Sequence, residues 1–106
     1  MTVEYIRYTV ADENRGAELL KAYGEAAKQL DAAPECHAYE LTRCEEDATS
    51  WILRIEWRST EDHLQGFRRG PHFPPFLESI RGFMKEIAEM RHYTLTDVRA
   101  RKSGTS

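Results

Sequence analysis

Alternating apolar and polar residues indicate four strands. Residues 3–10 are rich in β-branched and aromatic types, which favour strands. Residues 35–45 and 50–58 alternate on either side of a charged turn, which predicts a β-hairpin, and residues 88–98 have the composition of a last strand. In the first arm of the hairpin, the alternation predicts that His37 and Tyr39 share one face. In the second arm, one predicted face carries Trp51, Leu53, Ile55 and Trp57.

Helical spacing of apolar residues marks the segments between these strands. Residues 14–31 predict an amphipathic helix that ends before Pro34. A short helix is predicted from residue 59 to about residue 69, before Gly70 and Pro71, and a further helix over residues 72–86. In the last of these helices, the apolar positions are Phe73, Phe76, Leu77, Ile80, Phe83, Met84 and Ile87.

The resulting order, β-α-β-β-α-β, predicts an α+β ferredoxin-like domain with an antiparallel sheet and helices on one face. We assign residues 1–98 to this single domain and residues 99–106 to a polar C-terminal tail. Bulky groups such as Tyr5 and Tyr39 fall on both predicted faces of the strands. Because an apolar second face usually meets a partner, we expect a homodimer packed sheet to sheet.

Composition limits the classes of partner. The chain has 106 residues, a net charge of −3 and no run of apolar residues long enough to span a membrane. The charge argues against nucleic acid and against anionic membrane surfaces. No signal peptide is visible, so we expect a cytoplasmic protein.

Cys36 and Cys44 are too far apart on one strand for a disulfide, and their spacing does not match a zinc site.

Three motifs resemble the antibiotic biosynthesis monooxygenase (ABM) domain family, and the resemblance extends over roughly residues 3–98. Residues 34–41, Pro-Glu-Cys-His-Ala-Tyr-Glu-Leu, resemble the family strand Pro-Gly-Cys-x-x-Tyr-x-Leu. Residues 55–62 resemble its Glu-x-Trp strand end with the following helix start, and residues 70–73 resemble its Ser-x-His-Phe segment. The resemblance implies a dimeric α+β barrel with a pocket between the sheet and the helices of each subunit.

The family includes cofactor-independent quinone-forming monooxygenases, heme-degrading monooxygenases and small isomerases. The heme-degrading branch uses Asn, Trp and an axial His at positions that align with Ile6, Phe67 and Leu77. Without an imidazole at the ligand position, iron lacks an axial ligand. We therefore expect no heme, no other cofactor and no metal.

Cofactor-free oxygenation needs a site that binds a flat aromatic, holds a base or hydrogen-bond donor near its oxygen and excludes water. We select His72, Trp57 and Tyr39 as catalytic candidates, since imidazole, indole and phenol groups could supply these functions. The structural alternatives are an exposed helix cap for His72, a core anchor for Trp57 and interface packing for Tyr39. The residues expected to bind substrate are Tyr8, His37, Phe67, Phe73, Phe76 and Leu77.

Two further histidines are given no role. His63 falls on the short helix and is expected to be solvated, and His92 has no partner that the sequence identifies. The predicted function is a cofactor-independent monooxygenase that oxidises a small aromatic molecule of polyketide or quinol type. The alternatives are a small-molecule-binding or stress-response dimer without turnover, and an isomerase on the same scaffold.

Overall fold

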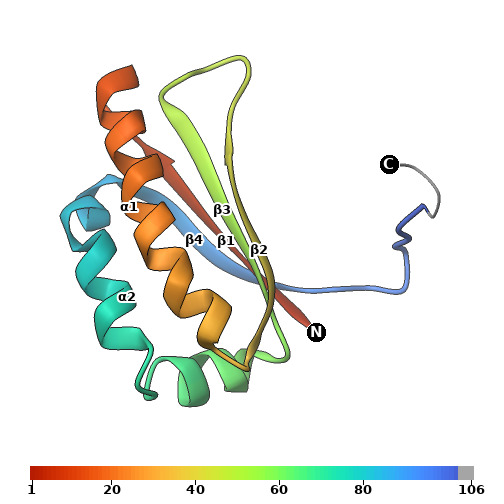
Figure 1. Cartoon of the computed structure of the whole chain (residues 1–106). Helices are drawn as coiled ribbons and strands as arrows, with labels where there is room; N and C mark the ends of the chain where they lie inside the picture. The colour runs from red at the N-terminus through yellow and green to blue at the C-terminus, as the bar shows by residue number, and fades with distance from the viewer. Residues whose placement is uncertain (103–106) are drawn as a thin grey trace.

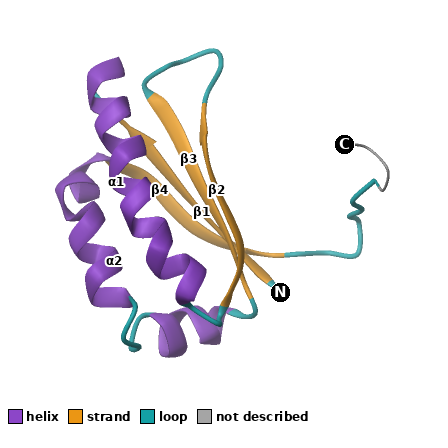
Figure 2. Cartoon of the chain, viewed as in Figure 1, coloured by secondary structure: helices purple, strands orange, loops and turns teal. Residues whose placement is uncertain are grey.

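The computed structural model describes residues 1–102 as a four-stranded antiparallel sheet with helices on one face (Figures 1 and 2). The elements, in chain order, are β1 (Thr2–Thr9), α1 (Glu13–Ala32), β2 (Cys36–Arg43), β3 (Ser50–Trp57), the π-helical turn η1 (Asp62–Phe67), α2 (Phe73–Ile80), the 3₁₀ segment η2 (Arg81–Glu86) and β4 (Ile87–Thr94). The strand order is β2-β3-β1-β4. The predicted ferredoxin-like α+β fold is confirmed.

The core lies between the helices and the face of the sheet that they cover. Alternate residues of β1 and β3 point into it, because strand side chains alternate between faces. On β3 these residues include Trp51 and Trp57, as the alternation predicted. The residues of the helices that meet them include Leu19, Tyr23, Leu30, Phe76, Ile80 and Phe83.

Helix α1 matches its prediction closely. Asp12 caps it by accepting a hydrogen bond from the backbone N–H of Arg15 at 2.9 Å.

The predicted helix over residues 72–86 is shorter than expected. Ile80 leaves helical geometry at φ −112° and ψ 1°, and the chain continues as a 3₁₀ segment that contains Gly82, a weak helix former. Phe83 remains buried, so apolar residues of both α2 and η2 pack into the core, as their spacing predicted.

Strict alternation along β2 is wrong at its start. Cys36 lies opposite Trp57 and Ala38 lies opposite Glu56, so His37 is an extra residue with no partner in β3. This β-bulge reverses the alternation. Cys36 and Tyr39 consequently both pack against the core, and His37 is exposed rather than sharing a face with Tyr39.

The last strand ends at Thr94, four residues before the predicted end. Thr94 pairs with Thr2 at the start of β1, so little of β1 remains for a longer strand to pair with. The last backbone contact between this end of the chain and β1 is the hydrogen bond from Leu95 N–H to the carbonyl of Met1, at 3.0 Å.

The predicted tail, residues 99–106, lies partly outside the described residues, which end at 102. No helix in the described part of the chain is long and apolar enough to cross a membrane.

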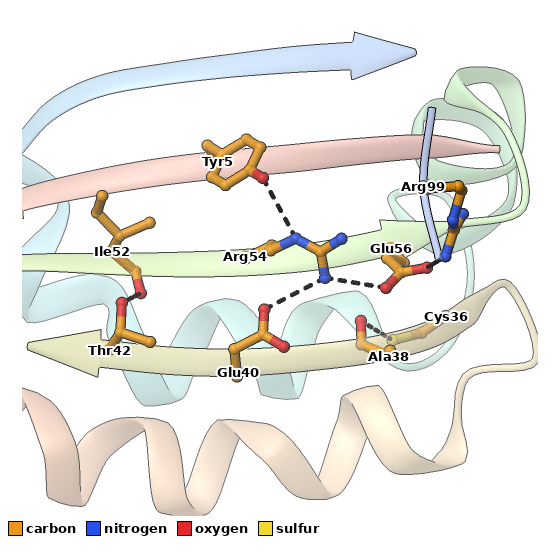
Figure 3. Close-up of polar contacts among 9 residues, drawn as sticks. All are labelled: Tyr5, Cys36, Ala38, Glu40, Thr42, Ile52, Arg54, Glu56 and Arg99. Carbon is orange, nitrogen blue, oxygen red and sulfur yellow. Dashed lines mark hydrogen bonds and ion pairs between the residues drawn. The ribbon is translucent and has the colours of Figure 1, made fainter. Parts of the chain in front are cut away.

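The other face of the sheet, which we call the open face, is not covered by helices. Arg54 lies at its centre, donates to the Tyr5 hydroxyl at 3.3 Å and pairs with Glu40 and Glu56 (Figure 3). Arg99, from the segment after β4, reaches Glu56 at 3.9 Å. Both signs of charge are thus interspersed with aromatic groups on this face.

Two glycines of α1 provide a matched test of the core. A Cβ at Gly24 would meet no atom within 4 Å, whereas a Cβ at Gly16 would lie 3.0 Å from the buried indole ring of Trp51. We expect Gly24→Ala to stabilise the fold by roughly 0.5–1 kcal/mol through helix propensity. Gly16→Ala should be less stable than Gly24→Ala by at least about 1 kcal/mol, because the indole must move in a close-packed core. Urea unfolding of both variants measures this, and equal stabilities would contradict the packing described.

Candidate functional site

A carboxylate is buried in the middle of the covered face. Glu4 lies on β1 between the inward-facing residues Thr2 and Ile6, and only 2% of it is exposed. A buried charge is costly unless other groups stabilise it. The residues around Glu4 therefore define the candidate site.

Trp57, at the end of β3, supplies the hydrogen bond to this carboxylate. Its indole Nε1–H donates to Glu4 Oε1 at 3.0 Å, and the residue is fully buried. Trp57 therefore occupies the predicted core position, and its indole N–H is hydrogen-bonded to Glu4, whereas the expectation was a donor for substrate. Trp51, by contrast, has a buried indole N–H with no hydrogen-bond partner among the described residues.

His63 is buried, with 3% exposed, so its expected solvation is wrong. The turn η1 places His63 and Phe67 inward, and Arg68 N–H bonds back to the His63 carbonyl at 3.0 Å. The imidazole stacks on the Trp57 indole with centroids 4.5 Å apart and planes 9° apart. Its Nε2 lies 3.5 Å from Glu4 Oε1. The spacing of four between His63 and Phe67 was the available indication that both face the core.

His92 completes the cluster from β4, where it is the ladder partner of Glu4. Its Nε2 lies 2.8 Å from His63 Nδ1 and 3.9 Å from Glu4 Oε2. The side chain is 28% exposed, so the cluster reaches solvent at this point. We call Glu4, His63 and His92 the Glu-His-His cluster. The sequence did not connect its members because their proximity depends on the register of β4 against β1.

Burial sets the protonation behaviour of the cluster. It raises the pKa of the Glu4 carboxyl, while the hydrogen bond from Trp57 and the charges of His92 and Arg68 act in the opposite direction. Burial, together with the neighbouring charges of His92 and Arg68, lowers the pKa of His63 to about 3. His63 is consequently neutral near pH 7 and can both donate and accept a hydrogen bond.

A small apolar cavity adjoins the cluster, between the sheet and the helices. Its volume is about 70 Å³, and Glu4, His63 and Arg68 are its polar lining groups besides Tyr8 and Trp57. Met84 and Met90 also line it and are 45% and 43% exposed. The predicted residues that line this cavity are Tyr8, Trp57, Phe67, Phe73, Phe76 and Leu77.

The remaining three predicted residues lie elsewhere. His72 precedes α2, with its Nδ1 3.3 Å from Gln29 Oε1, and does not line the cavity. The Tyr39 hydroxyl donates to Asp31 Oδ1 at 2.6 Å, and this bond, with burial, raises the pKa of Tyr39 to about 12. His37 is the exposed bulge residue. The structure therefore brings six of the nine predicted residues together around one cavity, and it adds the Glu-His-His cluster.

Tyr8 lies deep in the cavity wall and is fully buried. Its hydroxyl shares a hydrogen bond with the Tyr23 hydroxyl of α1. Burial raises the pKa of Tyr8 to about 12. The phenol is therefore protonated near pH 7 and fixed by its partner.

Known proteins of similar fold and sequence agree with this architecture. The chain is 24% identical over 76 residues to the uncharacterised protein YczJ of Bacillus subtilis, covering 72% of this chain and 80% of that protein. A Bordetella bronchiseptica protein designated as an antibiotic biosynthesis monooxygenase superposes with a TM-score of 0.71 at 21% identity, covering 90% and 96% of the two chains. A variant of SnoaB, a cofactor-independent oxygenase from Streptomyces nogalater, superposes with a TM-score of 0.66 at 18% identity, covering 93% and 94%.

The family model for antibiotic biosynthesis monooxygenases matches residues 1–79. That range contains Glu4, Trp57 and His63, whereas His92 lies beyond it. The match covers well over half of the chain, and the resemblance that the three sequence motifs carry is thereby confirmed. The chain belongs to the antibiotic biosynthesis monooxygenase family.

Proposed function

We propose that this protein is a monooxygenase that oxidises a small aromatic molecule, of phenol or hydroquinone type, without a bound cofactor. The observation that carries the proposal is the apolar cavity with a buried carboxylate in its wall. The description of SnoaB as a cofactor-independent oxygenase supports the same class of reaction. Membership of the family supports monooxygenation in general.

The reaction requires little chemistry from the protein. The substrate hydroxyl loses its proton, and the resulting phenolate gives an electron to O₂. Recombination at a ring carbon that carries hydrogen forms a C–O bond and a peroxide anion, which takes back the proton. The resulting hydroperoxide eliminates water together with the hydrogen of that carbon and leaves a quinone. One oxygen atom enters the product and the other leaves as water. All electrons come from the substrate, so no external reductant is needed.

Glu4 is the proposed acceptor for the substrate proton. It lines the cavity, and a carboxylate in a site of low dielectric is an effective base. Trp57 fixes Glu4 Oε1, which leaves the second oxygen toward His92. Arg68 lines the same cavity, so its positive charge favours a phenolate there.

Cavity size limits the substrate. The volume of about 70 Å³ is below the roughly 150 Å³ of an engineered cavity that accepts benzene. Met84 and Met90 lie in the cavity wall and are half-exposed, and methionine adapts readily because it is unbranched. A single ring could enter if these two side chains rotate, whereas a multi-ring substrate needs a larger movement. The proposal therefore favours single-ring substrates.

The small cavity also favours a second candidate, an isomerase that moves a proton with Glu4 and does not use O₂. The two candidates differ in oxygen consumption. An isomerase would exchange substrate protons with deuterated solvent while consuming no oxygen. The assay below therefore separates them.

We expect oxygen uptake by the purified protein with single-ring phenols or hydroquinones, in the presence of chelator and without flavin or heme. Glu4→Gln keeps the shape of the side chain but removes the base, so kcat should fall by about 10²–10⁴-fold. His72→Ala should retain activity, because His72 does not line the cavity. A polarographic oxygen electrode measures both. Loss of activity in His72→Ala with retention in Glu4→Gln would assign the base to His72 instead.

Two tryptophans give a matched pair for the positioning of Glu4. We expect Trp57→Phe to lower kcat by about tenfold or more, because one lost donor to a charged group is worth about 1.5–3 kcal/mol. Trp51→Phe removes an indole N–H that has no acceptor among the described residues, so kcat should be unchanged. Equal effects on kcat would show that bulk, and not the bond to Glu4, is what matters.

We further propose that the open face forms a homodimer interface. Tyr5, Ile52 and Tyr93 are large apolar residues exposed there by 37%, 36% and 47%, and the two tyrosine rings contact each other. Charges of both signs surround them, as on Arg54 and Glu40. Such a patch can pair with itself across a two-fold axis.

For the interface, we expect wild-type protein to elute as a dimer in light scattering coupled to size-exclusion chromatography at micromolar concentration. Ile52→Asp should shift it to monomer, because the substitution places an unpaired charge beside the exposed tyrosines of the proposed interface. Leu20→Asp is the control, since Leu20 is 54% exposed but lies on α1, away from the open face. A wild-type monomer would contradict the proposal.

A further inference from the structure

The Glu-His-His cluster joins three elements that are distant in sequence. Glu4 and His92 are ladder partners on β1 and β4, and η1 brings His63 against both. One ligand atom from each side chain can be chosen so that all lie within 4.8 Å of one another. The ladder and the stacking on Trp57 fix these positions, so the arrangement depends on the fold itself.

The chemistry of the three side chains suits a divalent transition metal ion. Two imidazoles and one carboxylate form the donor set of many zinc and non-heme iron sites. Such ions bind nitrogen and oxygen ligands at about 2.0–2.2 Å, which places the ligand atoms of a tetrahedral site about 3.4 Å apart. The contacts of 2.8, 3.5 and 3.9 Å do not belong to one set of donor atoms, because they use both nitrogens of His63 and both oxygens of Glu4. With one donor atom from each side chain, all separations lie within 4.8 Å. The side chains must therefore rotate toward a common point to bind an ion.

Burial strengthens the case. Glu4 and His63 are 2% and 3% exposed, so water contributes little to stabilising the carboxylate. No lysine or arginine forms a salt bridge to Glu4 among the ion pairs of the described residues, where its partners are His63 and His92. A dipositive ion would compensate this buried charge directly.

The surroundings resemble the outer shell of a metal site. Trp57 donates to Glu4 Oε1, the kind of hydrogen bond that orients a carboxylate ligand. Glu4 and His63 also line the cavity, so an ion held by three protein ligands would keep an open position toward it. His92, which is part-exposed, offers an entry path from solvent.

We propose that Glu4, His63 and His92 bind one divalent transition metal ion such as Zn²⁺ or Co²⁺. Mg²⁺ and Ca²⁺ do not suit this site, because they prefer oxygen donors. The proposal does not depend on the oxygenase reaction, since binding is measured on the protein alone. An ion at Glu4 would occupy the lone pairs of the proposed base, which is why chelator is present in the oxygen assay. If oxygen uptake appeared only after the metal ion was added back, the cofactor-free reaction would be contradicted, but the proposed metal site would not.

The test is titration of chelator-treated full-length protein with Zn²⁺ by calorimetry and with Co²⁺ by visible absorption. We expect one ion per chain, a d–d spectrum of low-symmetry Co²⁺ and no binding of Mg²⁺. His92→Gln, on a part-exposed strand, should weaken Zn²⁺ binding at least about tenfold and abolish the Co²⁺ spectrum. His63→Phe, which keeps a ring against Trp57, should do the same.

Two histidines outside the cluster provide the controls. His37→Gln and His72→Gln should bind Zn²⁺ like wild type, because His37 is exposed in the bulge and His72 lies beside Gln29. Far-UV circular dichroism and urea unfolding establish that each variant is folded. The proposal is overturned by an absence of stoichiometric binding at submillimolar Zn²⁺, or by binding that His92→Gln and His63→Phe leave unchanged.

Discussion

A carboxylate under the helices is the constraint on which the site depends. Glu4 occupies a strand position where an apolar residue would be the ordinary choice, and water hardly reaches it. The fold compensates with groups that converge from other elements: the Trp57 indole, the stacked imidazole of His63 and the imidazole of His92. Even the inward turn of η1 belongs to this arrangement, because it is what carries His63 to the sheet.

The two faces of the sheet perform different tasks. The covered face holds the core, the cavity and the polar cluster, which is buried except where His92 reaches solvent. The open face presents tyrosines and interspersed charges such as those of Arg54 and Glu40 (Figure 3). β1 contributes to both, since Glu4 and Tyr5 are neighbours that point in opposite directions. Tyr5, which lies in the proposed dimer interface, is therefore the immediate chain neighbour of the buried carboxylate.

Pattern and motif predicted the fold almost completely, because hydrophobic periodicity and Pro and Gly breakers are local properties of the chain. The same periodicity placed Phe67, Phe73 and Phe76 in one apolar group. Local patterns could not reveal the bulge at His37, which depends on pairing with β3, and so His37 and Tyr39 were assigned to one face incorrectly. The Glu-His-His cluster was missed for a related reason. Its members are distant in sequence, and strand register alone makes them neighbours.

The ladder pairing of Glu4 with His92 limits where insertions and deletions can occur as the sequence evolves. Side chains alternate along a strand, so an insertion of one residue between the bulge near Ile87 and His92 would carry the imidazole to the opposite face. An insertion before Ile87 would only lengthen the connection from η2 and leave the pairing in place. Among descendants that keep the cluster, length changes should accumulate upstream of the bulge, while the segment that follows it keeps a constant number of residues.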